Sequence, residues 1–410
     1  MSMTHSLGNY LLARYYVETT GNIERVADRL ATMETTGGWI FKTDPTERYA
    51  SCKGKVHLIE EREKGKGFVL LLFPLSNLNL KEAAFTDLWL SMIGGAAFDM
   101  IDYSKSRLID FALPSHALKY FVGPRFGIRG TRRLLGLAPG EPVIGTIIKP
   151  TAGLTPKEVA DICYKAALGG VRFIKDDEKM MNPSYCSLAE RVKQVTRRLR
   201  EAEKKTGLEV LYAPHISAGP DKIRENAKTA LKNGANALML NFFGSGFGSL
   251  EIIARDKQFN VPIYAHCGGR SAMSRVEGQG VDPSVIAKFA RLCGGDYFRT
   301  GTLGGYLVGS TEELKAISES LTAEVPGICD SVPVVSGGLN AANLAENLDF
   351  FGTDVLALAG SGLLAHPNGI IDGAKAFSQA AEAYVKKIPV EEYAETHSEL
   401  EVALRLEKKA

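Results

Sequence analysis

Lys175, Asp176, Asp177 and Glu178 stand together where the short apolar run 171–175 ends. Carboxylate oxygens are the ligands that a small divalent cation such as Mg²⁺ prefers, and Mg²⁺ keeps some waters that a substrate can displace. These four residues therefore indicate a magnesium site. A solvated, charged loop is the alternative interpretation of so short a string.

A further lysine, Lys149, ends the apolar run 143–149. A lysine that lies near a cation and is partly removed from water has a lowered pKa, and it can then act as a general base. Lys149 is therefore a candidate catalytic base. A salt bridge from Lys149 to Asp177 or Glu178 is the structural alternative.

Basic residues and glycine-rich turns follow the later apolar runs. In chain order they are His266, Arg270, Arg299, Ser336-Gly337-Gly338 and Gly360-Ser361. Bare backbone N–H groups in such turns can close on an anion. Together with the two arginines, the turns predict a phosphorylated small-molecule substrate, and His266 is a further catalytic candidate.

Eight short apolar runs alternate with amphipathic stretches, which predicts βα units and a parallel sheet. The runs are 143–149, 171–175, 209–214, 236–241, 262–266, 295–300, 332–336 and 354–359. Eight units in this length predict an α/β fold with a (β/α)₈ barrel, whose active site gathers at the carboxyl ends of the strands. A doubly wound open sheet is the alternative, but no glycine-rich dinucleotide fingerprint follows the first run.

The N-terminal region lacks this regular alternation. Segments 9–18, 56–63 and 67–75 have strand character, and 22–34 and 85–100 have helix character. We expect an α+β domain of ferredoxin-like type over residues 1–130, and the barrel with a helical tail over 131–410. The glycines and prolines of 110–133 predict a linker into the barrel.

The composition is that of an ordinary globular enzyme, with 45% hydrophobic residues and a formal net charge of +2. This charge gives no argument for a nucleic-acid partner, and no apolar run is long enough to predict a membrane helix. The first residues lack a secretory pattern, and none of the six cysteines forms a C-x-x-C pair. We therefore expect a cytoplasmic protein with reduced thiols.

Several strings, taken in order, are similar to the RuBisCO large-chain superfamily. They are TGGW (36–39), GPRFGIRG (123–130), GTIIKPTAGLT (145–155), GGVRFIKDDE (169–178), GGDYFRTGT (294–302), PVVSGGLN (333–340) and AGSGLLAHPNG (359–369). The resemblance covers most of the chain, and its motifs fall at the expected strand ends.

The resemblance implies specific roles for the candidate residues. Lys175 matches the lysine that takes up CO₂ as a carbamate, and Asp177 and Glu178 match its companions on Mg²⁺. Lys149 matches the lysine associated with enolisation, and the turns at 336–338 and 360–361 match the substrate and phosphate loops. In this family the N-terminal domain covers the partner's active site, which implies a homodimer or an assembly of dimers.

Four positions depart from the carboxylases that the chain resembles. Thr151 and Tyr306 stand where they have lysines, Arg299 where they have a histidine, and Gly95 where they have an asparagine. The counterparts of the strand-five arginine, here Arg270, and of the N-terminal glutamate, here near Glu34, stay open. The chain therefore resembles the RuBisCO-like, non-carboxylating form IV branch.

The sequence leads to a Mg²⁺-dependent, enolate-forming lyase or isomerase that acts on a phosphorylated keto-sugar or keto-sugar acid. Two arginines favour a decarboxylase, because they can hold a carboxylate as well as a phosphate. A methylthio-ribulose-phosphate isomerase or enolase of methionine salvage is the alternative, with Phe242, Phe243 and Phe247 as an apolar pocket or as core packing. A non-catalytic binding or regulatory protein is the alternative from another class.

Overall fold

The computed structural model describes residues 7–306 and 309–407, which divide between two compact units. The first unit takes the chain up to Val122 together with the segments 269–289 and 325–328. The second unit takes 123–268, 290–324 and the chain from Cys329 onward.

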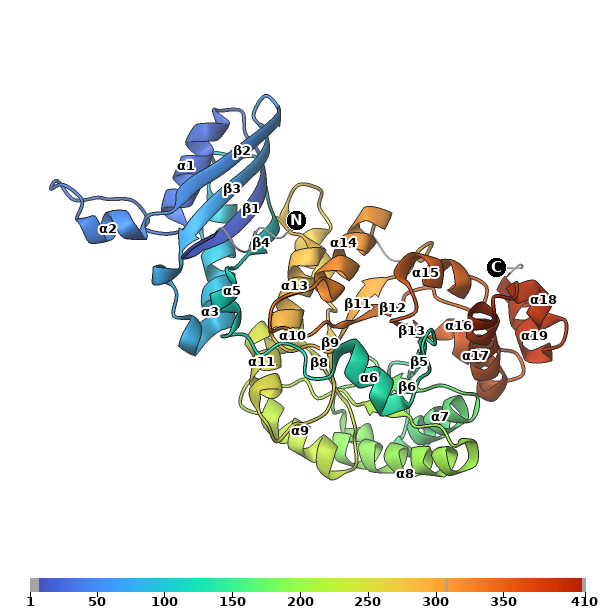
Figure 1. The fold of residues 1–410 in the computed structure, drawn as a ribbon. Helices are drawn as coiled ribbons and strands as arrows, with labels where there is room; N and C mark the ends of the chain where they lie inside the picture. Colours follow the sequence, from blue (N-terminus) through green and yellow to red (C-terminus); the bar gives the residue numbers. More distant parts are fainter. Residues whose placement is uncertain (1–6, 307–308, 408–410) are drawn as a thin grey trace. The chain divides into compact units, whose positions relative to one another are not determined.

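The first unit is built on a sheet in which four N-terminal strands pair antiparallel (Figure 1). In the order of the sheet they are β4 (Lys105–Ala112), β1 (Tyr10–Glu18), β3 (Lys66–Pro74) and β2 (Lys55–Glu63). Helix α1 (Ile23–Met33) joins β1 to β2, and α3 (Leu80–Ile93) and α4 (Ala96–Asp99) precede β4. This is a β-α-β-β-α-β arrangement, so the predicted α+β fold is confirmed.

A fifth strand, β10 (Gly280–Val281), pairs parallel with β4. It belongs to the segment 269–289, which also contains α12 (Arg270–Ser274). Arg107 of β4 fixes this segment, since its guanidinium bonds the Asp282 carboxylate at 3.1 Å and the Ser274 carbonyl at 3.0 Å. The sequence did not predict β10, because a two-residue strand has no periodicity to detect.

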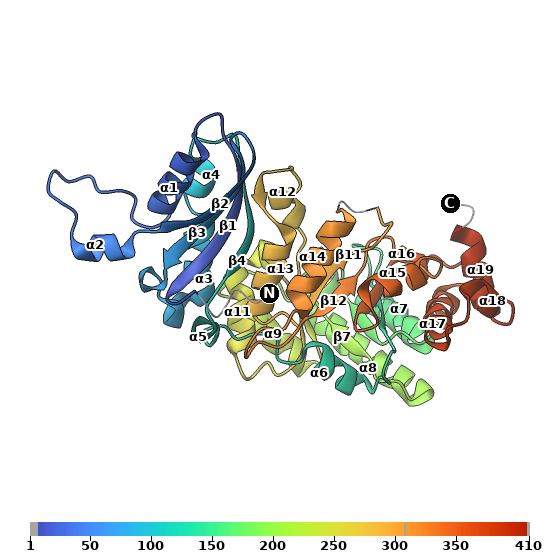
Figure 2. The same cartoon turned by 45° about the horizontal axis from the view of Figure 1, so that its top comes forward.

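The second unit contains an eight-stranded parallel barrel (Figures 1 and 2). Its strands are β5 (Val143–Ile147), β6 (Phe173–Lys175), β7 (Leu211–Ala213), β8 (Leu238–Asn241), β9 (Ile263–His266), β11 (Tyr297–Gly301), β12 (Val332–Val335) and β13 (Leu356–Ala359). The order is β7-β6-β5-β13-β12-β11-β9-β8, and an Ile216 N–H bond to the Met239 carbonyl at 2.9 Å closes the ring between β7 and β8. The predicted barrel and all eight of its strands are confirmed.

Helices follow the strands along the chain. They are α7 (Pro156–Leu168), α8 (Leu188–Thr206), α9 (Ile223–Lys232), α11 (Phe247–Arg255), α13 (Pro283–Leu292), α14 (Thr311–Thr322), α15 (Leu344–Phe351) and α17 (Ile370–Lys386). Thr155 and Glu158 form a reciprocal capping box that starts α7 directly after the first barrel strand and its loop. The tail forms α18 (Val390–Ala394) and α19 (Ser398–Glu407), which pack against α17.

Large side chains fill the barrel, and a helix closes its amino-terminal end. The rings of Phe173 and Tyr297 lie 4.8 Å apart in the core. Ile128 and Leu135 of α6 (Gly127–Leu135) pack against this core at the amino-terminal end of the barrel. The prediction of a linker at 110–133 is wrong in part, because this segment holds the end of β4, α5 (Ser115–Leu118) and most of α6. The start of α6 is stabilised by the Asp296 carboxylate, which accepts the N–H groups of Phe126 and Gly127.

Across residues 7–306 and 309–407, no helix has both the length and the apolar character of a membrane span.

Candidate active site

The barrel residues predicted to do chemistry lie at the carboxyl ends of neighbouring strands. Along the strand order β6-β5-β13-β12-β11-β9 they are Lys175, Lys149, Gly360-Ser361, Ser336-Gly337-Gly338, Arg299 and His266. The parallel pairing places all of these ends at one mouth of the barrel, where barrel active sites gather.

Lys175 is the last residue of β6, and its side chain is almost completely buried, with 1% of its surface exposed. Nζ donates to the main-chain carbonyl of Asp176 at 2.9 Å and lies 5.5 Å from the centre of the Tyr264 ring. Burial lowers the pKa of Lys175 to about 8, although Glu178 and Asp177 oppose this effect. An amine with such a pKa is partly neutral near pH 8, and the neutral amine is the form that can add CO₂.

Lys149 forms an ion pair with the carboxylate of Asp177. Its Nζ also lies 3.2 Å from Oγ1 of Thr151, and the side chain remains 44% exposed, so it can reach a molecule in the mouth. Asp177 is buried, but its bonds from Lys149 and from the Lys179 N–H lower the pKa of this carboxyl. The salt bridge considered as the alternative role of Lys149 is thus present. A cation on Asp177 would compete with it and release the amine.

Asp177 and Glu178 supply two carboxylates beside Lys175. Among the described residues, no group of three or more His, Cys, Asp or Glu side chains is arranged to hold a metal ion. Two carboxylates alone are a poor set for Mg²⁺, which prefers octahedral oxygen coordination. A carbamate on Lys175 would add a third oxygen donor next to these two, so the residues present fit Mg²⁺ only when Lys175 is carbamylated.

His266 ends β9 and is buried next to Glu178. Its Nδ1 accepts the Gly268 N–H at 3.1 Å, so the neutral ring carries its proton on Nε2, which lies 3.6 Å from Oε2 of Glu178. Burial, assisted by the positive charges of Lys175 and Arg299, holds the pKa of His266 well below its ordinary value. The imidazole is therefore neutral at physiological pH and can donate a hydrogen bond.

Arg299 lies on β11, and its positive charge is close to Cys267 and Glu178. The charge also acts on His266. Arg299 and His266 therefore lie within electrostatic reach of Lys175 and Glu178.

The two glycine-rich turns follow the adjacent strands β12 and β13. Gly337 and Gly338 have φ of +108° and +99°, a region that L side chains rarely adopt, and the Gly338 carbonyl accepts Nδ2 of Asn343 at 2.9 Å. Ser336 is buried beneath the turn, while Ser361 starts the short helix α16 (Ser361–Leu364). The two turns therefore lie next to each other at the carboxyl ends of β12 and β13.

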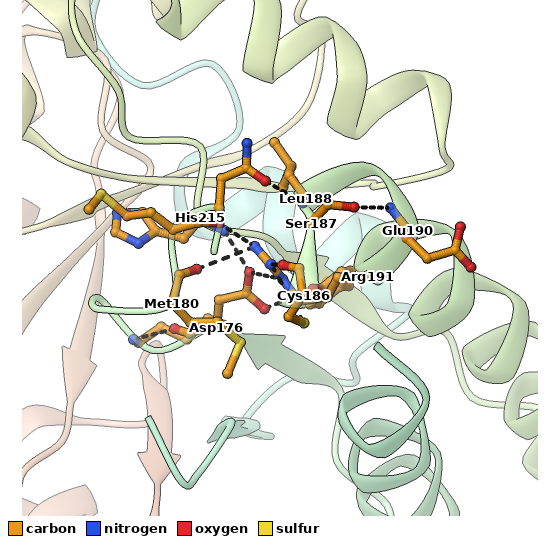
Figure 3. A network of polar contacts seen from close by, with 12 residues as sticks. Asp176, Met180, Cys186, Ser187, Leu188, Glu190, Arg191 and His215 are labelled. Atoms are coloured by element: carbon orange, nitrogen blue, oxygen red, sulfur yellow. Dashed lines mark hydrogen bonds and ion pairs between the residues drawn. The ribbon is translucent and has the colours of Figure 1, made fainter. Parts of the chain in front are cut away.

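The acidic string divides between the mouth and the back of the strand, and the resemblance had assigned only Asp177 and Glu178, not Asp176, to Mg²⁺. Asp176 faces away from the mouth, and its carboxylate accepts the His215 N–H at 2.9 Å and Nε of Arg191 at 3.0 Å (Figure 3). It also accepts the Tyr212 hydroxyl at 2.7 Å. The signal was available, because successive residues of a strand point to opposite faces, so Lys175 and Asp176 cannot both face inward.

His215 follows the carboxyl end of β7. Its ring is buried, and Nε2 shares a hydrogen bond of 2.7 Å with Oγ of Ser217. Burial lowers the pKa of His215 to about 3. The main-chain N–H of His215 donates to the Asp176 carboxylate at 2.9 Å, and its ring also interacts with the main chain of Asp177.

The aromatic residues after β8 favour the packing interpretation. Phe242, Phe243 and Phe247 contact one another, with ring centres 4.8 to 5.1 Å apart. They form a cluster rather than separate walls of a pocket.

The remaining candidates are Arg270, Glu34, Gly95 and Tyr306. Arg270 is buried in α12, in the first unit. Glu34 also belongs to that unit, where it accepts the Ala97 N–H at 2.5 Å, and burial raises its pKa to about 7. Gly95 starts α4 with φ of +42°, and Tyr306, which belongs to the second unit, is 80% exposed.

The fold and this constellation define a (β/α)₈-barrel protein with a buried lysine and two carboxylates at the mouth. The sequence family model of the ribulose bisphosphate carboxylase large chain, catalytic domain, matches residues 127–406. The family model of the N-terminal domain of the same large chain matches residues 5–117. The chain therefore belongs to the RuBisCO large-chain family.

Two kinds of relatives are similar to the whole chain. A 3-oxo-isoapionate-4-phosphate decarboxylase of Rhizobium rhizogenes is 33% identical, over 95% of this chain and 96% of that protein. A ribulose bisphosphate carboxylase of Pyrococcus abyssi is 31% identical, over 96% of this chain and 92% of that protein. Sequence identity alone thus barely separates a decarboxylase from a carboxylase.

Solved structures give the same family. The octameric Rubisco of Pyrococcus horikoshii OT3 superposes with a TM-score of 0.92 at 29% identity, covering 97% of this chain and 93% of that chain. A rubisco-like protein of Alicyclobacillus acidocaldarius gives 0.88 at 28% identity, covering 97% and 98%. The dimeric archaeal Rubisco of Hyperthermus butylicus gives 0.90 at 27% identity, covering 97% and 95%.

Proposed function

We propose that this chain is a Mg²⁺-dependent decarboxylase of a phosphorylated keto-sugar acid, acting through an enolate, and that it is not a CO₂-fixing carboxylase. The observation that carries the proposal is the cluster of Lys149, Lys175, Asp177 and Glu178 with Arg299 beside it. The similarity to 3-oxo-isoapionate-4-phosphate decarboxylases supports the same reaction class.

Lys175, as a carbamate, would hold Mg²⁺ together with Asp177 and Glu178. When bound, the ion would supply Lewis-acid polarisation of a keto oxygen. The protein would position the substrate around this point: Ser336 and the turns at 337–338 and 360–361 would bind the phosphate through N–H groups, and Arg299 would pair with the carboxylate.

Decarboxylation of a 3-keto acid breaks the bond between the carboxylate carbon and its neighbour. The electron pair of that bond moves toward the keto group and forms the enolate, CO₂ leaves, and a proton must then be added to the carbon. Lys149 is the exposed lysine at the mouth and would deliver this proton, while neutral His266 would donate a hydrogen bond from Nε2.

Carboxylation is disfavoured by the residues that replace the groups it uses. Thr151 and Tyr306 are uncharged where the carboxylases have lysines, and Tyr306 is largely exposed. Loss of a positioned charge at a developing negative charge costs on the order of 3 kcal/mol of transition-state stabilisation. Two such losses make enzyme-like CO₂ fixation implausible.

The test is activity of the purified protein with Mg²⁺ and bicarbonate on a panel of keto-sugar phosphates and keto-sugar-acid phosphates. We expect CO₂ release from a sugar-acid phosphate and no fixation of labelled CO₂ on ribulose bisphosphate. Lys175→Ala should be inactive, and full activity of this variant would refute the metal site. Fixation of labelled CO₂ at enzyme-like rates would refute the proposed function.

Lys149→Ala separates decarboxylation from isomerisation. A decarboxylase should still release CO₂ and lose only the directed final protonation, which is followed as loss of stereospecific deuterium incorporation from D₂O. An isomerase or enolase needs a base in its first step, so its turnover should fall by about 10²–10⁴-fold. Loss of CO₂ release in Lys149→Ala would contradict the proton-donor role.

A further inference from the structure

Arg191, in the first turn of α8, is a fully buried arginine whose side chain points back at the segment between β6 and α8 (Figure 3). Nε donates to the Asp176 carboxylate at 3.0 Å, Nη1 to the Cys186 carbonyl at 2.6 Å, and Nη2 to the carbonyls of Met180 and Met181 at 3.3 and 2.7 Å. One side chain therefore fixes this segment near its start, middle and end.

The segment carries both carboxylates of the candidate metal site. The carboxylate of Asp176, the residue just before Asp177, also accepts the Tyr212 hydroxyl and the main-chain N–H of His215. The backbone that presents Asp177 and Glu178 is thus clamped between α8 and the end of β7.

We propose that Arg191 is a positioning residue, which sets the orientation of Asp177 and Glu178 for Mg²⁺ through Asp176 and the three carbonyls. The inference rests on the proposed function, because it concerns the same metal site. Arg191 has no exposed surface, so it acts through the segment and touches neither substrate nor metal.

Lysine cannot replace this arginine. A guanidinium presents five donors in a planar fork, whereas an ammonium is a compact charge that cannot span acceptors on several sides. Loss of an outer partner of metal ligands typically weakens metal affinity by 10–100-fold. A purely structural role would lower the melting temperature and leave the Mg²⁺ requirement unchanged.

The chain offers a matched control in Arg291, on α13. It is also buried, and it donates to the carbonyls of Ser320, Ala323 and Cys329 at 2.8 to 3.2 Å, on the chain that leads into the amino end of β12. Arg291→Lys makes the same chemical change to a buried arginine that holds carbonyls away from the mouth.

The experiment follows the carbamate of the full chain by NMR with ¹³C-bicarbonate while Mg²⁺ is titrated. We expect Arg191→Lys to require about 10–100-fold more Mg²⁺ than the wild type, and Arg291→Lys to titrate like the wild type. Equal Mg²⁺ requirements for the two variants would overturn the positioning role. No carbamate in the wild type would overturn the metal site itself, and the positioning role with it.

If Arg191→Lys does not fold, the same Mg²⁺ titration of Tyr212→Phe tests the positioning role. It removes one hydroxyl from the Asp176 carboxylate and leaves the ring in place. We expect a shift of the Mg²⁺ requirement by a few-fold in the same direction, and a wild-type titration would overturn the inference.

Discussion

Asp296, at the amino-terminal end of the barrel, should make the stability of the fold depend on pH. Its buried carboxylate accepts the N–H groups of Phe126, Gly127 and Ile263 at 2.7, 2.9 and 2.8 Å. Burial raises the pKa of Asp296 to about 6, even though these three bonds act in the opposite direction. Asp296→Asn removes the titration and keeps one oxygen for the N–H groups at the start of α6.

The direction in which stability changes with pH follows from the pKa of Asp296 in the folded and the unfolded state. An unfolded aspartate titrates near 3.9, so the folded state holds this proton more tightly. The added stability is fully present below about pH 4 and is lost as pH rises through 6. Between pH 5 and pH 8 the wild type should lose about 1.4 kcal/mol through this group, which is about 2 °C if 410 residues melt together.

The assay is thermal unfolding of the wild type and Asp296→Asn between pH 5 and pH 8. The variant should lose some stability at every pH, since its amide cannot accept the Ile263 N–H. The advantage of the wild type should nevertheless shrink by about 2 °C as the pH rises. Asp330→Asn, which removes a carboxylate beside the same helix, controls for general charge effects. A difference that stays constant over this range would refute the reasoning.

Three further outcomes are expected. Gly338→Ala should raise KM for the phosphorylated substrate at least about tenfold without changing the Mg²⁺ requirement. The reason is that a positive φ disfavours alanine by about 1–2 kcal/mol and that the added Cβ would lie 3.2 Å from Cα of Gly305. An unchanged KM in steady-state kinetics would contradict this. Light scattering should give a homodimer, and a particle of 44.4 kDa at micromolar concentration would exclude it. Glu34→Gln should flatten the pH dependence of the free energy of unfolding between pH 5 and pH 7 in denaturant titrations. Burial raises the pKa of Glu34 to about 7, so ionisation of this group destabilises the fold as the pH rises. An unchanged dependence of the unfolding free energy on pH would count against this.

The barrel could be predicted from the sequence because its signal is repeated eight times. Each strand is a short apolar run, and the residue at its carboxyl end, such as Lys175 or His266, is placed at the mouth by the fold itself. Helix α6 escaped prediction because its start depends on Asp296, about 170 positions away in the sequence. The same holds for β10, which exists only because Arg107 and β4 are available to pair with it.

The resemblance, and not the acidic string by itself, separated Asp177 and Glu178 from Asp176. Asp176 and Asp177 are adjacent and chemically identical, yet one is bonded to Arg191 behind the strand and the other to Lys149 at the mouth. The pairing of Asp176 with a residue on α8 depends on tertiary packing, which the string Lys-Asp-Asp-Glu does not contain.

The replaced groups are not all on one side of the mouth, because Oγ1 of Thr151 lies 3.2 Å from Nζ of Lys149 after β5. The cluster on β5 and β6 and the turns after β12 and β13 keep the residue types of the family, whereas Arg299 and Tyr306 lie on β11 and the loop that follows it. Changes at Arg299 and Tyr306 can alter the fate of an enolate without disturbing the residues on β5 and β6 that would form it. Tyr306→Lys alone should therefore not create a carboxylase, because the charge of Arg299 would still favour a substrate carboxylate at the same side. Detectable CO₂ fixation by that single variant would show that the lysine, and not the whole side of the mouth, decides the reaction.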